Sequence, residues 1–480
     1  MGVRAHRRRP GVWEVEPQGG MRVPARIYAS DALMEQIRGD DSLEQACNVA
    51  HLPGIVTASL AMPDMHEGYG FPIGGVAAFT LDEGIVSPGG VGYDINCGVR
   101  LMRTDLRAAE LGERLTRLVH QLQRDIPAGV GSEGAIKKLS DKELNEVLRR
   151  GAEWPVEQGW GEGEDLLTTE AEGCLPGADP DAVSPRARER GAPQLGTLGS
   201  GNHFAEVQVV DEVFLPEAAA AFGLEEGLVT VLLHSGSRGL GYQVCDDALA
   251  TMAKAADRYG LTLPDRQLVS VPVSSREGAR YLAAMRAAAN FAWANRQVMM
   301  ALIEQAFIRV LGGSRRTLGF RLVYDVAHNI AKLEEHLVEG RPTRVLVHRK
   351  GATRAFPAGH PEVPAAYRQV GQPVLIPGDM GRASFVCVGT PRAMEETFGT
   401  AAHGAGRTLS RTAARKVGGH RNIVKELQAR GIVVAARSRK TLAEEMPEAY
   451  KDASQVVAAL EEAGIARVVA RLRPLGVVKG

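Results

Sequence analysis

The 480-residue chain has few features of a membrane protein or a secreted protein. It contains no apolar run near the roughly 18 residues that a membrane-spanning helix needs, and its basic start, MGVRAHRRRP, lacks the apolar stretch of a signal peptide. Its five cysteines, at positions 47, 97, 174, 245 and 387, are odd in number and widely scattered. Such cysteines do not form a disulfide framework. These absences predict no membrane association and a reducing, cytoplasmic location.

The sequence also lacks an excess of charge and the common nucleotide-binding motifs. The 57 basic residues balance 57 acidic residues, so the formal net charge is zero. Any contact with nucleic acid must therefore come from a local patch. Neither the P-loop pattern G-x-x-x-x-G-K-[ST] nor a strand-placed G-x-G-x-x-G is present. A nucleotide would have to be held by other means.

Hydropathy patterning predicts a mixed α+β fold. Short β-branched runs predict strands at 55–60, 228–233, 321–326, 344–347 and 384–388. Apolar residues at helical spacing predict a long helix at 278–311 and shorter helices at 111–124, 244–259, 405–416 and 452–465. Strands and helices are interleaved without the regular alternation of a doubly wound sheet. We therefore expect one large compact unit in which mixed β-sheets are surrounded by helices.

We expect that unit to be a single catalytic domain spanning residues 1–480, with two peripheral segments. Residues 1–20 are basic and predict an N-terminal arm that either touches nucleic acid or is simply solvated. Residues from about 151 to 195 are rich in Gly, Pro, Glu and Asp. Their composition predicts an exposed, loop-like insertion.

Four histidines share one local sequence context. His203, His234, His328 and His403 each lie in or at the end of a strand-like run, beside small or amide residues. At a strand end the scaffold presents side chains to a loop, and polar side chains there more often face a cleft than a core. Any one of these histidines, taken singly, is more often structural. Four with the same context suggest a shared site.

The segment GGVGYDINCG adds a carboxylate and a thiol to this set. Its glycine-rich turn presents Asp94 and Cys97 three residues apart. Thiolate, imidazole and carboxylate are ordinary ligands of first-row divalent metals, and a thiolate has lone pairs to bridge two ions. A lone Cys97 would be interpreted as a small buried hydrophobe, but the adjoining Asp94 favours a metal site. No Cys-x-x-Cys pair is present, so the pattern is not that of a zinc finger.

Two glycine-containing segments are candidates for binding phosphate. Residues 377–382, PGDMGR, form a turn with exposed amides, and residues 403–407, HGAGR, are expected to lead into a helix. Amides at a helix start attract phosphate oxygens, and a neutral His403 there could attack phosphorus. The alternative for this segment is a helix start of purely structural use.

Basic residues near the histidines are candidates for gripping RNA phosphates. Arg349, Lys350 and Arg354 fall in what we predict to be a loop after a strand. Arg238 lies close to His234, where it could clamp an anionic substrate. A solvated charged face is the alternative interpretation of such a run.

Read together, seven motifs resemble the RtcB family of RNA ligases. They are GYDINCG, GTLGSGNHFAE, HSGSRGLG, DVAHN, VHRKGATRA, PGDMG and HGAGR, which occur in that family's order, in a resemblance that runs from about residue 55 to Lys479. Each motif is weak alone, and the series is specific. The resemblance implies an RtcB-like fold and a GTP-dependent ligase. Such an enzyme joins an RNA 3′-phosphate or 2′,3′-cyclic phosphate end to a 5′-hydroxyl end, in RNA repair or tRNA splicing.

The resemblance also implies roles for individual residues. His403 would accept guanylate from GTP and pass it to the RNA 3′-phosphate, giving an activated RNA-3′-pp-5′-G end. Two manganese ions would be held, one by Asp94, Cys97 and His203 and the other by Cys97, His234 and His328, although these residue types would also accept zinc.

The GTP site implied by the resemblance comprises Asn202, His203, Phe204, Ala205, Glu206, His328, Asn329, Pro377, Gly378, Met380, Ser384, His403, Gly404, Ala405, Gly406, Tyr450 and Lys479. In it Glu206 would accept hydrogen bonds from guanine, and Tyr450 would offer a ring for stacking. Many relatives have Ser where this chain has Asp379, so Asp379 is assigned no binding role.

Two other functions fit the same residues. One is a phosphatase or cyclic phosphodiesterase that acts on RNA ends with a dinuclear metal centre. The other is a non-catalytic RNA-binding or RNA-remodelling protein. The resemblance also allows an archease-type activating protein as a partner. The physiological RNA and the oligomeric state are not predicted.

Overall fold

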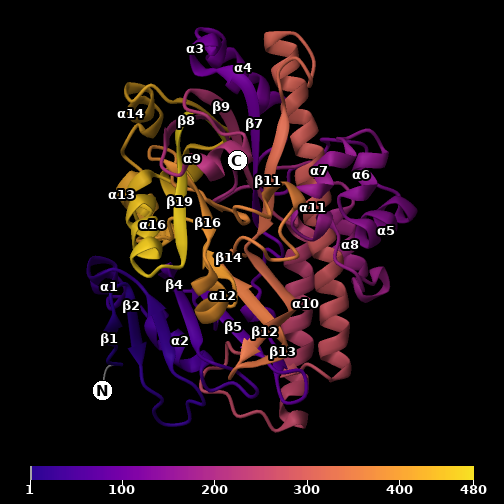
Figure 1. Cartoon of the computed structure of the whole chain (residues 1–480). Helices are drawn as coiled ribbons and strands as arrows, with labels where there is room; N and C mark the ends of the chain where they lie inside the picture. The colour runs from indigo at the N-terminus through magenta and orange to yellow at the C-terminus, as the bar shows by residue number, and fades with distance from the viewer. Residues whose placement is uncertain (1–2) are drawn as a thin grey trace.

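The computed structural model of the protein describes residues 3–480, which fold around two large β-sheets (Figure 1). The strands of the first sheet are, in spatial order, β1 (His6–Arg9), β2 (Val12–Val15), β3 (Ala25–Tyr28), β4 (Ser59–His66), β5 (Ile73–Phe79), β13 (Arg341–Lys350) and β12 (Asn329–Val338). The strands of the second are β11 (Arg321–Ala327), β7 (Gly98–Arg107), β9 (Leu228–Ser235), β8 (Phe204–Val213), β19 (Ala466–Lys479), β16 (Ser384–Gly389) and β15 (Pro373–Ile376), with β18 (Val433–Ala436) beside β19. Pairs β3–β4 and β18–β19 are parallel and the other neighbours are antiparallel.

Helices cover both sheets, and two short strand pairs complete the β-structure. The α-helices are α1 (Asp31–Ile37), α2 (Ser42–Val49), α3 (Ala108–Leu111), α4 (Arg114–Asp125), α5 (Asp141–Arg150), α6 (Glu153–Glu157), α7 (Gly163–Leu167), α8 (Pro185–Gly191), α9 (Pro216–Phe222), α10 (Arg238–Ala256), α11 (Arg276–Leu311), α12 (Pro391–Thr397), α13 (Arg411–Gly418), α14 (Ile423–Ala429), α15 (Arg439–Glu444) and α16 (Ala453–Glu462). The strand pairs are β6 (Ile85–Val86) with β10 (Val271–Pro272), and β14 (Ala352–Arg354) with β17 (Thr400–Ala402). The 3-10 helices are η1 (Pro88–Gly90), η2 (Glu170–Gly173), η3 (Pro180–Ala182), η4 (Asp257–Tyr259), η5 (Ala365–Tyr367) and η6 (Pro447–Ala449). The predicted mixed α+β fold is confirmed.

The long helix α11 packs in one hydrophobic cluster with residues of the second sheet. It is capped by Ser275, whose side chain accepts from the Gly278 amide, and it packs against β9, α4, α5 and α10. It is buried on nearly all sides, including the polar side chains Asn295 and Arg296 at its middle. Because buried polar groups must find partners, these side chains are expected to hold neighbouring segments in place. The predicted helix at 278–311 is confirmed.

The predicted N-terminal arm over 1–20 is corrected by the structure. Residues 1 and 2 lie outside the described residues, but β1 and β2 form an antiparallel hairpin at the edge of the first sheet. Val12 and Val15 are buried, and β2 pairs with β3. The alternating apolar residues that follow the basic run anchor it to the sheet.

The predicted loop-like insertion at 151–195 is also corrected. The segment contains α6, α7, α8, η2 and η3, and it lies beside α11 in Figure 1. Trp154, Leu175 and Val183 are buried and join the same hydrophobic cluster as α11. A few well-placed apolar residues are enough to bury a segment whose average composition is that of a loop.

The predicted starts of one helix and one strand were wrong. The helix expected at 405–416 begins only at Arg411, after the Ser410 cap. Before it, Gly406 has φ +73°, and a Cβ there would lie 2.1 Å from the Asp64 carbonyl oxygen. This close approach demands glycine and ends any helical path. The strand expected at 55–60 begins at Ser59 and continues to His66.

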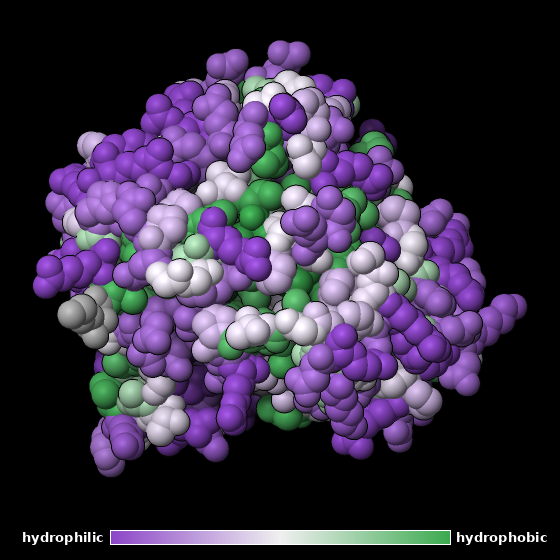
Figure 2. Space-filling model, turned by 90° about the horizontal axis from the view of Figure 1, so that it is seen from below, coloured by the Kyte–Doolittle hydropathy of each residue, from purple (hydrophilic) through white to green (hydrophobic). Residues whose placement is uncertain are grey.

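The surface shows scattered apolar side chains. No helix within residues 3–480 combines the length and hydrophobicity needed to cross a bilayer. Large exposed apolar residues include Val130, Leu167 and Leu337. Figure 2 shows one face, with hydrophilic residues around its rim and hydrophobic residues gathered near its middle.

Candidate active site

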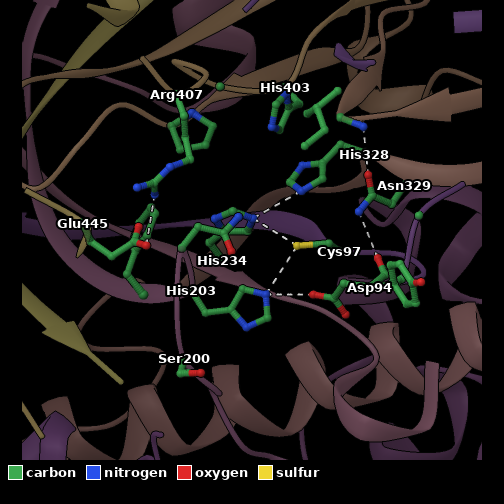
Figure 3. A pocket seen from close by; sticks show the side chains of 18 of the residues that line it. Asp94, Cys97, Ser200, His203, His234, His328, Asn329, His403, Arg407 and Glu445 are labelled. Carbon is green, nitrogen blue, oxygen red and sulfur yellow. Dashed lines mark hydrogen bonds and ion pairs between the residues drawn. The ribbon is translucent and has the colours of Figure 1, made fainter. Parts of the chain in front are cut away.

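Most of the predicted metal ligands lie at strand ends on one side of the second sheet. Because β11, β7, β9 and β8 are antiparallel neighbours, the starts of β7 and β8 lie beside the ends of β9 and β11. Cys97 and His203 directly precede β7 and β8, His234 lies near the end of β9, and His328 directly follows β11. Residues separated by more than 200 positions therefore face one cavity (Figure 3).

Asp94, Cys97 and His203 form the first group of donors. The Nε2 atom of His203 lies 2.9 Å from Asp94 Oδ2 and 3.4 Å from Cys97 Sγ. On the other side of the ring, Nδ1 lies 2.8 Å from the Leu198 carbonyl oxygen. That carbonyl accepts the Nδ1 proton, so the Nε2 lone pair faces the thiol and the carboxylate.

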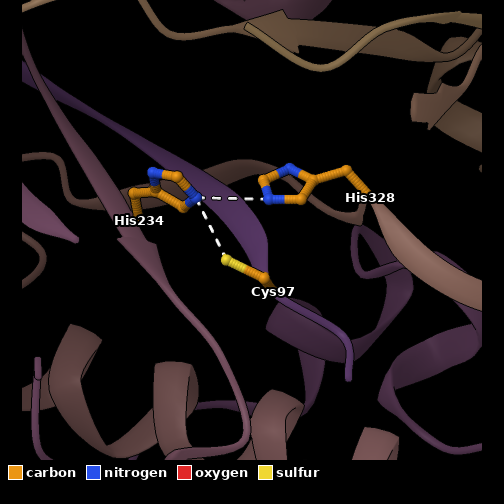
Figure 4. A group of neighbouring side chains, drawn as sticks. All are labelled: Cys97, His234 and His328. Carbon is orange, nitrogen blue, oxygen red and sulfur yellow. Dashed lines mark hydrogen bonds between the residues drawn. The ribbon is translucent and has the colours of Figure 1, made fainter. Parts of the chain in front are cut away.

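Cys97, His234 and His328 form the second group, shown in Figure 4. His234 Nε2 lies 3.2 Å from Cys97 Sγ and 3.2 Å from His328 Nε2. In each group the donor atoms lie within 4.8 Å of one another, and Cys97 belongs to both. A thiolate shared by two sets of nitrogen and oxygen donors fits a pair of divalent ions.

The protonation of these groups agrees with such a role. Burial lowers the pKa of His234 and of His328 well below the ordinary value, so both imidazoles are neutral at pH 7. Burial raises the pKa of the Cys97 thiol, and a bound metal ion would deprotonate it. For Asp94, burial opposes ionisation, but the neighbouring His203 and Arg238 together outweigh it and lower the pKa.

A buried arginine holds the segments that carry these ligands. Arg296 of α11 is fully buried, and its guanidinium donates five hydrogen bonds of 2.8–2.9 Å to Asn96, Ser235 and Asp325. Asn96 adjoins Cys97, Ser235 adjoins His234, and Asp325 lies on β11 shortly before His328. All five N–H groups are used, so one side chain fixes three ligand-bearing segments.

His403 lies beside the candidate metal ligands and is oriented by a buried carboxylate. Its ring centre is 4.9 Å from that of His328, at an interplanar angle of 69°. Its Nδ1 lies 2.5 Å from Oδ2 of Asp64, which also accepts from the backbone amides of His403 and Gly404. Asp64 is fully buried on β4. Sequence reasoning missed Asp64, because it lies in an apolar segment, Met62-Pro63-Asp64-Met65, without a recognisable motif.

The candidate metal ligands and His403 line one cavity of about 750 Å³. Most of the predicted GTP-site residues line it, namely Asn202, His203, Phe204, Glu206, His328, Asn329, Pro377, Gly378, Met380, His403, Gly404, Ala405, Gly406, Tyr450 and Lys479. Ala205 and Ser384 are buried and are not among the lining residues. The Ser384 hydroxyl instead accepts from the Gly378 amide at 3.0 Å, which orders the 377–382 turn.

One end of the cavity contains a buried cluster that the sequence only partly indicated. Glu445 lies 3.2 Å from Arg407 and 3.6 Å from Lys479, and it accepts a hydrogen bond from the Tyr450 hydroxyl. The Arg407 guanidinium lies over the Tyr450 ring, 4.9 Å from its centre. Burial raises the pKa of nearby Glu206 to about 8.

The predicted RNA-contacting residues are in two different environments. Arg238 lines the cavity and donates to the Thr197 hydroxyl at 3.2 Å. Arg190, Gln194 and Arg411 also line it, and sequence reasoning missed them. Arg190 was overlooked because its segment was interpreted as a loop-like insertion.

The assignment of Arg349, Lys350 and Arg354 to RNA phosphates is corrected. They lie on β13 and β14 rather than in a loop, and at most 6% of each is exposed. Arg349 pairs with Glu334 of β12, and Arg354 with Glu362. Lys350 lines the cavity, but its ammonium donates to the carbonyls of Tyr69 and Phe71. The two arginines are held by partners within the protein.

Asp379 has a local structural role. Its carboxylate accepts from the Gly381 amide at 2.9 Å and pairs with the Arg382 side chain. Its charge is thus matched by Arg382 within the same turn.

Comparisons with known proteins show the family to which the chain belongs. The family model described as tRNA-splicing ligase RtcB matches residues 45–480. The chain is 56% identical over 469 residues to the tRNA-splicing ligase RtcB of Thermococcus kodakarensis, covering 98% of this chain and 97% of the relative. It is 56% identical over 472 residues to that of Archaeoglobus fulgidus, again covering 98% and 97%. The chain belongs to the RtcB family, and the resemblance seen in its motifs is confirmed.

Proposed function

We propose that this protein is a GTP-dependent RNA ligase that joins a 3′-phosphate or 2′,3′-cyclic phosphate end to a 5′-hydroxyl end through a guanylylated His403. Membership of a family of tRNA-splicing ligases makes the chain an RNA ligase enzyme. The finer statement rests on one observation: the Asp64-oriented His403 lies beside a double group of metal donors in a single cavity.

His403 is placed to act as a nucleophile on phosphorus. The Nδ1 proton is donated to Asp64, which leaves the Nε2 lone pair to attack the α-phosphorus of GTP. The new N–P bond forms as the bond to pyrophosphate breaks. An oxygen of the RNA 3′-phosphate then takes the guanylyl group and frees His403. The 5′-hydroxyl finally attacks the activated 3′ end, losing its proton, and GMP leaves. A cyclic end must first be opened by water.

The metal donors would serve the same reaction. Asp94, Cys97 and His203 would hold one divalent ion, and Cys97, His234 and His328 a second. Such ions neutralise phosphate charge and align the reacting groups. We infer manganese from the family resemblance, because the donor set alone also fits zinc.

Guanine would be recognised at the Glu206 end of the cavity. Glu206 lines the cavity near Lys479, which lies over the Phe204 ring. Guanine would bind the ionised form of Glu206 and lower its pKa, because a carboxylate accepts from both N1–H and the 2-amino group of guanine, whereas adenine lacks that pair of donors. The Arg407 guanidinium lies over the Tyr450 ring, 4.9 Å from its centre. A base would therefore stack on the other face of the ring or on the guanidinium.

The site and the sheets support one catalytic domain. The cavity lining extends from His66 to Lys479 and draws on both large sheets. All five cysteines are free thiols, which agrees with a reducing cytoplasm. An archease-type activating protein is an additional proposed partner, inferred from the family resemblance alone.

Trapping of the covalent intermediate tests the proposal. The protein is incubated with labelled GTP and MnCl2, denatured and counted. Wild type is expected to retain label, His403→Ala to retain none, and Asp64→Asn to acquire label more slowly. ATP serves as the matched control nucleotide. A metal-dependent hydrolase of RNA ends, or a non-catalytic RNA-binding protein, would give no adduct, and that result would reject the ligase mechanism.

A further inference from the structure

One segment outside the catalytic residues concentrates the positive charge of a chain that is neutral as a whole. Residues 411–440, called here the basic segment, contain nine lysines and arginines and one glutamate. The rest of the chain therefore has a net negative charge. Eight of the nine cations are exposed, namely Arg411, Arg415, Lys416, Lys425, Arg430, Arg437, Arg439 and Lys440.

The packing of the basic segment turns its cations outward. Its elements α13, α14 and β18 and the start of α15 bury Ala414, Leu427 and Val434 in one hydrophobic cluster. Helix α13 packs on α15, and α14 on β18. Figure 1 shows α13 and α14 at the periphery of the molecule. Within the described chain, ion pairs of this segment involve only Arg415 and Arg421. Most of the cations are thus free to meet an external anion.

Both ends of the basic segment reach the active-site cavity. Arg411, the first residue of α13, lines the cavity. Strand β18 pairs with β19 so that Ala436 lies opposite Lys479, another lining residue. The amide of Arg437 donates to the Lys479 carbonyl. If the end of a polyanion is bound in the cavity, the rest of its chain would pass over the basic segment where it runs out of the cavity.

The composition of the face favours nucleic acid over a protein partner. The segment contains no aromatic residue, and Val417 is its one large exposed apolar side chain within residues 3–480. Centres of protein interfaces are depleted in charged residues as a whole and enriched in aromatic residues, and this segment has the opposite composition. Phosphate backbones are instead bound by arginine and lysine with little apolar contact.

We infer that the basic segment binds the phosphate backbone of an RNA strand whose end is held in the active-site cavity. The inference rests on the proposed function for the identity of the polyanion. It adds a binding surface beyond the residues that touch the reacting ends.

RNA affinity of a charge-reversed variant tests this surface. Fluorescence anisotropy is measured without GTP on single-stranded RNAs of about 20 and about 4 nucleotides. In Lys416→Glu/Lys425→Glu/Arg430→Glu, we expect the dissociation constant of the long RNA to rise at least about tenfold. Since each phosphate contact on a single strand contributes roughly 0.7, the slope of log affinity against log salt should fall by about 2. Binding of the short RNA, which reaches only the cavity, should not change.

A matched triple variant separates local contacts from net charge. Lys254→Glu/Arg341→Glu/Arg344→Glu reverses three exposed cations in α10 and β13, outside the basic segment. It should leave long-RNA affinity within about twofold of wild type. Lys416→Gln/Lys425→Gln/Arg430→Gln should give an intermediate loss of long-RNA affinity with an unchanged melting temperature. Equal long-RNA affinities for the two glutamate triples would overturn the inference, and so would equal losses for the two RNA lengths.

The two proposals fail in distinguishable ways. Lys416, Lys425 and Arg430 lie outside the cavity lining. In the charge-reversed variant, His403 should therefore be labelled from GTP as in wild type. Absence of labelling in wild type would reject the proposed mechanism, while the anisotropy experiment would still test the surface. Normal labelling with unchanged affinity for long RNA would reject the surface alone.

Discussion

Two basic stretches of this chain have opposite environments. Residues 348–354 contain an arginine-lysine pair and Arg354 within seven positions, and these three side chains are buried. Residues 411–440 spread nine cations over thirty positions, and most are exposed. The difference is topological: β13 lies between β5 and β12, whereas α13 and α14 cover one side of a cluster and face solvent on the other. Local charge density therefore indicates a charged surface only where the fold leaves the segment uncovered.

The largest effect should come from the buried stretch. Arg349→Ala leaves Glu334 buried without its main cation, so we expect a loss of about 3–5 kcal/mol in unfolding free energy, measured in urea. Arg344→Ala, at the exposed part of the same strand, is the matched control and should change it by less than about 0.5 kcal/mol. If Arg349→Ala were as stable as wild type but bound RNA more weakly, the original assignment to RNA would be restored.

A second buried cation should act on the metal site. In Arg296→Lys the ammonium cannot make the five hydrogen bonds of the guanidinium, so Asn96 and Ser235 lose support. We expect manganese affinity, measured by calorimetric titration of metal-free protein, to fall about 10- to 100-fold. Arg100→Lys is the control, because Arg100 shares the Asp325 carboxylate but donates no hydrogen bond to Asn96 or Ser235. Equal losses in both variants would mean that the effect is general destabilisation.

The contrast between burial and exposure extends to carboxylates. Burial raises the pKa of Glu206 to about 8, above the ordinary 4.5. Between these values the folded protein binds a proton that the unfolded chain does not, so the contribution of Glu206 to stability is lost as pH rises from 4.5 to 8. Between these pH values the unfolding free energy should fall by up to about 1.4 kcal/mol per pH unit because of Glu206. Glu206→Gln should remove this fall. Urea unfolding at pH 5, 6.5 and 8 measures this, and exposed Glu335→Gln should leave the slope unchanged.

The smallest effect on stability should come from the exposed stretch. Lys416→Ala removes a solvated charge, so unfolding free energy should change by less than about 0.5 kcal/mol. Binding of a 20-nucleotide RNA should nevertheless weaken about two- to threefold, because one phosphate contact is lost. A stability loss above 1 kcal/mol, measured in urea, would show that the basic segment resembles the buried stretch after all.

Sequence reasoning found much of the site because its residues share a recognisable local context. Each of the four histidines lies at or beside a strand end, and the antiparallel order of the strands brings three of them to Cys97. The helix at 278–311 was equally accessible, since its apolar spacing is long and regular. At these positions the structure predicted from the local sequence is the one that the whole fold requires.

The missed features depend on contacts between distant segments. Asp64 and Glu445 acquire their roles only through His403 and Arg407, each remote in sequence. The late start of α13 depends on the approach of Gly406 to the Asp64 carbonyl. The burial of Arg349 depends on Glu334 in a neighbouring strand. No single-sequence pattern records these distances.

Metal content per chain tests the shared-thiolate site most directly. After loading with manganese and desalting, elemental mass spectrometry should find two ions in wild type, one in Asp94→Ala and one in His328→Ala, following the two donor groups. Because Cys97 belongs to both groups, Cys97→Ala should retain neither ion tightly. A Cys97→Ala protein that keeps two ions, or a wild type that binds none at these residues, would contradict the account.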